Sequence, residues 1–138
     1  MSPLKINHIA VVVTDLDAAL PFWQTALGLP LQRTEHNPDE AVSIAFLPVG
    51  DSEIELLAPT DAESGVAKYL AKNGGGLHHI CLEVADMQAA LAQLTAHGIT
   101  LINEQPRTRP DGVLYAFVHP KSTGGVLVEL YQMRANAE

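Results

Sequence analysis

Apolar and polar positions alternate along several short segments of the chain, which is the pattern of strands with one buried face. Segment 6–13 is apolar and rich in β-branched residues, and segment 77–84 repeats its pattern, so we expect each to form a buried strand. Segments 15–27 and 86–97 follow them with apolar residues at helical spacing, and a glycine comes directly after each. Further strand-like segments follow each expected helix. The pattern therefore predicts two βαβββ units and an α+β fold.

The remaining elements can be placed from their composition. We expect strands at 29–34, 42–47 and 53–57 in the first unit, and at 99–103, 113–118 and 126–131 in the second. Polar loops are expected at 35–40 and 104–112, and a short linker helix at 66–72. The units then span about 5–58 and 76–132, and we assign residues 1–138 to a single domain.

The two units are related in sequence as well as in pattern. Adding 71 to the number of His8 gives His79, and the match continues without a gap into the helix that follows. A later stretch brings Glu55 opposite Glu129 in the same way. Two copies of a unit that lacks a closed core are expected to pack on each other about a pseudo-twofold axis.

Four polar side chains occupy equivalent places in this repeat. Side chains alternate between the faces of a strand, so one His and one Glu of each unit lie on the face opposite its helix. Buried carboxylates need partners, and imidazole with carboxylate is a common ligand set for divalent metals. We therefore predict a metal site formed by His8, Glu55, His79 and Glu129. A nonspecific polar seam between the units is the alternative.

Composition limits the kinds of partner that we expect the protein to bind. The formal net charge is −8 and only 8 residues are Lys or Arg, which disfavours a nucleic-acid surface. A single cysteine, Cys81, excludes an internal disulfide and fits a reducing compartment. No apolar run approaches the length of a membrane span. We expect a soluble cytoplasmic protein that binds neither nucleic acid nor membrane.

Several longer motifs carry a family resemblance. They are NHIAV at 7–11, IELLAP at 54–59, AKYLAKNGGGLHHI at 67–80 and HPKSTGGVLVEL at 119–130. With these motifs the chain resembles the vicinal oxygen chelate superfamily, and within it most of all the methylmalonyl-CoA epimerases, over essentially residues 5–132. The resemblance implies a fold of paired βαβββ units that hold a divalent metal ion in a cavity.

The resemblance also implies a ligand set and a reaction. In that family the metal ligands correspond to His8, His79 and Glu129, and a Gln or Glu at position 55 completes the set. The metal is Co, Mn, Ni or Zn, among which the sequence does not choose. The implied isomerase reaction inverts C2 of methylmalonyl-CoA by two-base proton transfer through a metal-stabilised enolate. Glu55 and Glu129 are the candidate bases, an acyl-CoA is the small-molecule substrate, and a homodimer is expected.

The chain departs from the family at a few positions. Some bacterial epimerases carry a glutamate, assigned as a base, where this chain has Ile44. A glycine-rich turn of the family is replaced by a bulkier loop with Arg107 and Arg109, which suits either solvation or contact with an anionic substrate. Ala41 stands where glycine is common. His78 belongs to the family's double-histidine pattern but faces away from His79, so we expect it to pack or to donate a hydrogen bond.

Other functions remain open within the same superfamily. A glyoxalase I-type lactoylglutathione lyase would use similar ligands to move a proton between adjacent carbons of a glutathione hemithioacetal. An extradiol dioxygenase would need open metal positions, which a fourth ligand at Glu55 would crowd. A metal-free ligand-binding protein of the antibiotic-resistance type would keep the fold and bind no stoichiometric metal.

Overall fold

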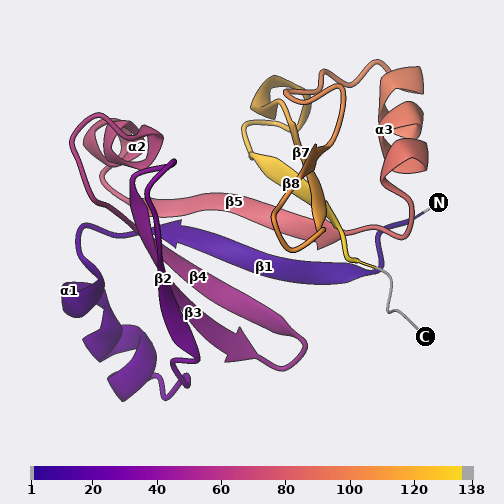
Figure 1. The fold of residues 1–138 in the computed structure, drawn as a ribbon. Helices are drawn as coiled ribbons and strands as arrows, with labels where there is room; N and C mark the ends of the chain where they lie inside the picture. Colours follow the sequence, from indigo (N-terminus) through magenta and orange to yellow (C-terminus); the bar gives the residue numbers. More distant parts are fainter. Residues whose placement is uncertain (1, 135–138) are drawn as a thin grey trace. The chain divides into compact units, whose positions relative to one another are not determined.

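A computed structural model of the chain describes residues 2–134 (Figure 1). The chain forms two compact units. One consists of residues 8–78, and the other joins the N-terminal residues up to Asn7 to the residues from His79 onward. Among the described residues, no helix is long and apolar enough to cross a membrane.

The unit of residues 8–78 contains the first βαβββ pattern. Its elements are β1 (Lys5–Val12), which enters this unit at His8, α1 (Leu16–Leu20), the π-helical turn η1 (Pro21–Ala26), β2 (Arg33–Asn37), β3 (Val42–Val49), β4 (Ser52–Pro59) and α2 (Gly65–Asn73). The strands lie in the order β2-β3-β4-β1, with β1 parallel to β4 and the other neighbours antiparallel. The expected linker helix is therefore present as α2.

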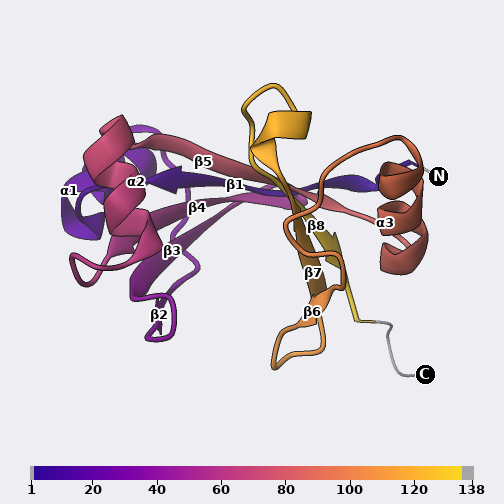
Figure 2. The same cartoon turned by 90° about the horizontal axis from the view of Figure 1, so that it is seen from above.

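The other unit repeats the pattern. Its elements are β5 (Gly76–Glu83), which enters this unit at His79, α3 (Met87–Ala96), β6 (Arg107–Thr108), β7 (Leu114–Val118), the short 3₁₀ turn η2 (Pro120–Ser122) and β8 (Val128–Gln132) (Figure 2). These strands lie in the order β5-β8-β7-β6, again with one parallel pair, β5 with β8. The predicted α+β class and the duplicated βαβββ pattern are confirmed.

Aspartates begin the helix that follows the first strand of each unit. The Asp15 carboxylate accepts a hydrogen bond from the Asp17 amide at 3.3 Å, and the Asp86 carboxylate accepts one from the Ala89 amide at 3.1 Å. After α1 the helix widens at η1, where the Leu27 amide donates to the carbonyl of Phe22, five residues earlier, at 2.8 Å. The helix predicted at 15–27 is thus one α-helical turn followed by a π-helical turn.

Two predicted strands were wrong. Segment 29–34 was expected as a strand and 35–40 as a loop, whereas the strand is β2 at Arg33–Asn37. Leu29 and Leu31 pack into the core beneath α1, which explains their apolar character without a strand. β2 is an almost fully exposed edge strand with polar side chains, so hydrophobic periodicity does not mark it.

The second wrong strand lies at 99–103. Only an isolated bridge from Leu101 to Val118 forms there, and the edge strand is β6 inside the expected loop 104–112. Leu101 packs against the core beneath α3. In both units an apolar segment fills the core after the helix, and the exposed edge strand comes later.

Each unit has a core beneath its first helix. In one, side chains of α1 and η1 pack on one face of the strands around Ala45, Leu47 and Leu56. In the other, Met87 and Leu91 of α3 pack on Val84, Ala116 and Leu130. Figure 1 shows that α1 and α2 lie on opposite sides of the first unit's strands, and α2 covers Ala10 and Val12.

Candidate metal centre

His8 and Glu55 form a buried pair within the unit of residues 8–78. In the parallel register of β1 and β4, Ala10 is the neighbour of Glu55, and His8 lies two residues before Ala10 on the same face. The His8 Nδ1 atom lies 3.1 Å from the Glu55 Oε2 atom. Only 1% of His8 and 8% of Glu55 is exposed to solvent. The contact therefore replaces hydration that both polar groups have lost.

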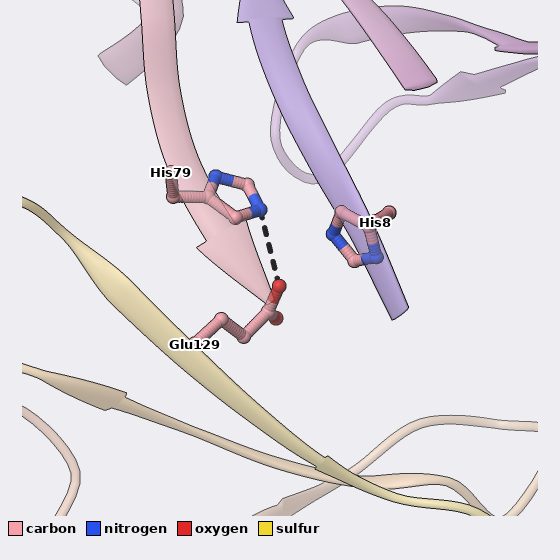
Figure 3. A group of neighbouring side chains, drawn as sticks. All are labelled: His8, His79 and Glu129. Atoms are coloured by element: carbon pink, nitrogen blue, oxygen red, sulfur yellow. Dashed lines mark ion pairs between the residues drawn. The ribbon is translucent and has the colours of Figure 1, made fainter. Parts of the chain in front are cut away.

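His79 and Glu129 form the equivalent pair in the other unit. Cys81 is the β5 neighbour of Glu129 on β8, and His79 again lies two residues before that neighbour. The His79 Nε2 atom lies 3.1 Å from the Glu129 Oε1 atom, drawn as a dashed line in Figure 3. Both side chains are buried. The sequence repeat is thus a repeat of strand register, which places one imidazole against one carboxylate in each unit.

A phenylalanine flanks each carboxylate on the neighbouring strand. Phe46 of β3 is the cross-strand partner of Glu55, and Phe117 of β7 is the partner of Glu129. The Phe117 ring also meets the His79 ring edge-on, with centroids 5.7 Å apart. Apolar rings beside a buried imidazole and carboxylate exclude water, which strengthens the electrostatic interaction between them.

Three of the predicted ligands converge. One potential ligand atom from each of His8, His79 and Glu129 lies within 4.8 Å of the other two, and all three residues are buried (Figure 3). His8 is the residue at which the chain passes from one unit to the other. Two imidazoles and a carboxylate form a donor set that fits a divalent metal of the first transition row or Zn²⁺.

Glu55 is not a member of this group of three, although it contacts His8. A carboxylate next to a ligating histidine can bind the metal itself or hold the imidazole in position. The prediction that Glu55 completes the ligand set therefore remains a prediction.

Two further residues lie where the sequence indicated. His78 faces away from His79, and its ring meets the ring of Tyr69 on α2 edge-on, with centroids 4.9 Å apart. Ile44 packs against the buried cluster of Ala10, Val12 and Leu57, so the position of the base in some bacterial epimerases is part of an apolar core here. Neither residue belongs to the group of His8, His79 and Glu129.

Sequence reasoning missed Tyr131. It lies on β8 two residues after Glu129 and therefore on the same face, and its hydroxyl accepts a hydrogen bond from Arg109 Nη1 at 2.9 Å. Strand alternation places Tyr131 on that face, but its contact with Arg109 depends on how the β6–β7 hairpin folds back. Arg107, the other arginine of this loop, is exposed and pairs through its backbone with Tyr115.

Comparison with known proteins identifies the family. The model of the glyoxalase/bleomycin resistance protein/dioxygenase superfamily matches residues 7–117. The chain belongs to this superfamily. The resemblance seen in the sequence motifs is therefore confirmed, and the duplicated βαβββ pattern is the vicinal oxygen chelate fold.

Relatives within the superfamily include epimerases. The chain is 39% identical to the human mitochondrial methylmalonyl-CoA epimerase over 129 residues, which cover 93% of this chain and 73% of the human protein. It is 37% identical to the ethylmalonyl-CoA/methylmalonyl-CoA epimerase of Cereibacter sphaeroides over 131 residues, covering 94% and 98% of the two chains.

A solved structure of a methylmalonyl-CoA epimerase is also similar to this chain. A single-residue variant of Streptomyces coelicolor methylmalonyl-CoA epimerase, in complex with 2-nitronate-propionyl-CoA, superposes with a TM-score of 0.85 at 36% identity. The superposition covers 99% of this chain and 99% of that chain.

Proposed function

We propose that this protein is a metal-dependent isomerase that inverts C2 of methylmalonyl-CoA. The observation that carries the proposal is the pair of buried His–Glu contacts at equivalent positions of the two units. Similarity to methylmalonyl-CoA epimerases over more than nine-tenths of this chain supports the same reaction and an acyl-CoA substrate.

We assign the metal ligands to His8, His79 and Glu129, with Glu55 as the fourth. The convergence of the first three supports this assignment. A divalent cation held there would act as a Lewis acid that stabilises negative charge developing on the substrate oxygens. Co²⁺, Mn²⁺, Ni²⁺ and Zn²⁺ all suit imidazole and carboxylate ligands.

Inversion at C2 requires a base on one face of the planar enolate and an acid on the other. We assign these two roles to Glu55 and Glu129, which are buried carboxylates at equivalent positions. Ile44 has no proton to transfer, so we assign to Glu55 the role of the base that some bacterial epimerases carry at that position. Apolar neighbours such as Phe46 and Phe117 keep water away from the carbanionic intermediate.

We further propose that the two units belong to a single domain and that the protein acts as a cytoplasmic homodimer. The acidic composition and the single buried cysteine fit the cytoplasm. Exposed apolar side chains such as Phe22 and Leu77, which are 56% and 50% exposed, are suitable for burial against a second copy. Sedimentation velocity of the purified protein tests the oligomeric state.

A stereochemical assay tests the proposed reaction. The Co²⁺-loaded protein is incubated with (2S)-methylmalonyl-CoA. The two epimers are then distinguished with a second enzyme that converts only one of them. We expect equilibration of the epimers. In parallel, methylglyoxal with glutathione tests lactoylglutathione lyase activity, and metal analysis after purification without chelator tests a metal-free binding protein. Product only from methylglyoxal, or no stoichiometric metal, contradicts the epimerase proposal.

A further inference from the structure

A cavity of about 230 Å³ lies beneath α3, within the unit that contains the residues from His79 onward. Its walls come from α3, β5, β7, β8 and η2, and from Ser2 and Pro3 at the start of the chain. Figures 1 and 2 both show the start of the chain beside α3. Ser2 and Pro3 are exposed, so the cavity reaches the surface of this unit. A small molecule therefore has a route into it.

The lining of this cavity is mostly apolar. Leu, Val, Ile and Ala side chains supply most of it, and none of the described lining residues carries a charge. The Ser122 hydroxyl accepts a hydrogen bond from the Thr100 amide at 3.0 Å, and the Thr123 hydroxyl accepts one from the Val126 amide at 3.0 Å. Both hydroxyls are thus engaged with the backbone. Water finds few partners in such a lining, which favours a neutral, apolar occupant.

The internal repeat shows which side chain fills the equivalent place in the other unit. Leu94 of α3 corresponds to Trp23, at the same offset of 71 that relates the two first strands. Trp23 packs against the core cluster of Ala45, Leu47 and Leu56 beneath α1. Leu94 packs against the equivalent cluster beneath α3 and lines the cavity. Because Leu lacks the two fused rings of Trp, the core beneath α3 is left with open space.

Two strand positions of the cavity wall are also smaller than their counterparts. Val118 of β7 corresponds to Leu47, and Val128 of β8 corresponds to Ile54. Each valine lines the cavity and has one methylene fewer than its counterpart. Leu82 of β5 is larger than its own counterpart by one methylene and offsets only part of this difference. The cavity is therefore the place where the second copy of the repeat lacks the side chains that close the first.

We propose that this cavity binds a small, neutral aromatic molecule of about the size of indole. The aromatic class follows from the ring that the other unit places at the equivalent position, and the neutral class follows from a lining without charge. An engineered apolar cavity of about 150 Å³ is known to bind benzene. A volume of about 230 Å³ is therefore sufficient for two fused rings.

The proposed site is separate from the His–Glu contact of the same unit. Val128 and Leu130 line the cavity, and they alternate along β8 with Glu129, whose side chain lies on the opposite face. Binding of an aromatic molecule beneath α3 therefore does not depend on the proposed epimerase function.

A titration with indole tests the inference on the full-length protein. Methyl signals are followed by ¹H–¹³C NMR, since the ring current of a bound indole shifts nearby methyl groups. We expect saturable shifts of Leu94, Val128 and Leu130, with a Kd on the order of 1 mM or lower, which is a range that such small ligands can reach. Indole-3-acetate carries the same ring with a carboxylate. It should bind at least about 10-fold more weakly, because a buried charge finds no partner in this lining.

Two variants copy the other unit and should close the cavity. Leu94→Trp should weaken indole binding at least about 10-fold, because close-packed interiors have no room for a second ring system. The double variant Val118→Leu with Val128→Ile leaves the helix unchanged and should weaken binding about 2- to 5-fold. It keeps the test decisive if Leu94→Trp does not fold.

Ala92→Trp is the matched control. It adds the same ring at an exposed position of α3 and should bind indole like the wild type. Wild-type circular dichroism and midpoints of thermal unfolding no lower than that of the wild type establish that the variants are folded.

Three results overturn the inference. One is the absence of saturable methyl shifts at millimolar indole. Another is undiminished indole binding in the folded cavity-filling variants, which places the bound indole elsewhere. The third is binding of n-hexanol at least as tight as that of indole, which removes the preference for an aromatic ring. The proposed epimerase function is measured separately, by inversion of methylmalonyl-CoA.

Discussion

At the scale of single residues, His78 and His79 are adjacent in the chain but lie on opposite faces of β5. His79 contacts Glu129 at 3.1 Å, whereas His78 packs on Tyr69. This pair offers a control within one dipeptide, because the same substitution changes a candidate ligand at one position and a packing residue at the next.

We predict that His79→Ala loses its metal and His78→Ala keeps it. Removal of a group that only orients a ligand typically costs 10- to 100-fold in affinity, so loss of a ligand should cost about 100-fold or more. Metal content by mass spectrometry after dialysis, together with a Co²⁺ titration followed by absorbance, measures the difference. Stoichiometric metal in His79→Ala would remove this residue from the ligand set.

The role of Glu55 is tested by Glu55→Gln. An amide oxygen can still bind a metal but cannot accept a proton as a base. We therefore expect metal content to persist while the rate of C2 proton exchange falls by about 10²- to 10⁴-fold. Glu53→Gln, on the same strand, is the control for loss of one carboxylate and should exchange at the wild-type rate. A wild-type rate in Glu55→Gln would restrict Glu55 to metal binding.

The sequence predicted these residues because the repeat relates them one by one. The His and Glu positions are equivalent in the two units, and side chains alternate along a strand. These two facts suffice to place each His–Glu pair on the face opposite the helix of its unit. The Arg109–Tyr131 hydrogen bond could not be predicted in that way. It joins side chains 22 residues apart across a hairpin whose edge strand is polar, and no local pattern encodes that contact.

At the scale of elements, helices were located well and edge strands were not. Asp15 and Asp86 mark the helix starts by chemistry that can be read in the sequence, since a short acidic side chain satisfies otherwise unbonded amides. β2 and β6 lack a buried face, and what defines them is backbone pairing to a neighbouring strand. The tertiary fold determines which strands pair. Hydrophobic periodicity therefore predicted strands at the apolar segments that precede β2 and β6.

The contribution of the N-terminal cap of α3 to the free energy of unfolding should be measurable. Asp86→Ala removes the side-chain acceptor for the Ala89 amide and should lower the free energy of unfolding by about 1 kcal/mol. Gln88→Ala, at an exposed position of the same helix, should change stability by less than about 0.5 kcal/mol. Urea denaturation followed by circular dichroism compares the two. Equal effects would show that the Asp86 carboxylate does not cap the helix.

The turn before β3 contains a strained residue. Ala41 has φ +51° and is the one non-glycine residue with positive φ in the described part of the chain. A left-handed conformation costs an L residue about 1–2 kcal/mol, whereas glycine pays about 0.5–1 kcal/mol in entropy. Ala41→Gly should therefore stabilise the protein by about 0.5–1 kcal/mol in chemical denaturation. Destabilisation instead would mean that the Ala41 methyl group makes contacts that outweigh the strain.

At the scale of the whole molecule, metal binding and folding are linked. Any ligand that binds the folded state alone stabilises it, by about 2.7 kcal/mol at a concentration 100 times its Kd. Added Co²⁺ should raise the unfolding midpoint of the wild type, and a chelator should reverse the shift. The same titration should leave His79→Ala almost unchanged. An equal shift in both proteins would place the stabilising metal elsewhere.

Metal-assisted proton removal from C2 of an acyl-CoA can be observed directly in solution. Proton NMR follows the C2 proton of (2S)-methylmalonyl-CoA in D₂O with the purified, Co²⁺-loaded protein. We expect rapid loss of that signal, which a chelator should abolish and fresh Co²⁺ should restore. Persistence of the C2 signal with metal tightly bound would contradict the epimerase function while leaving the fold and the metal site intact.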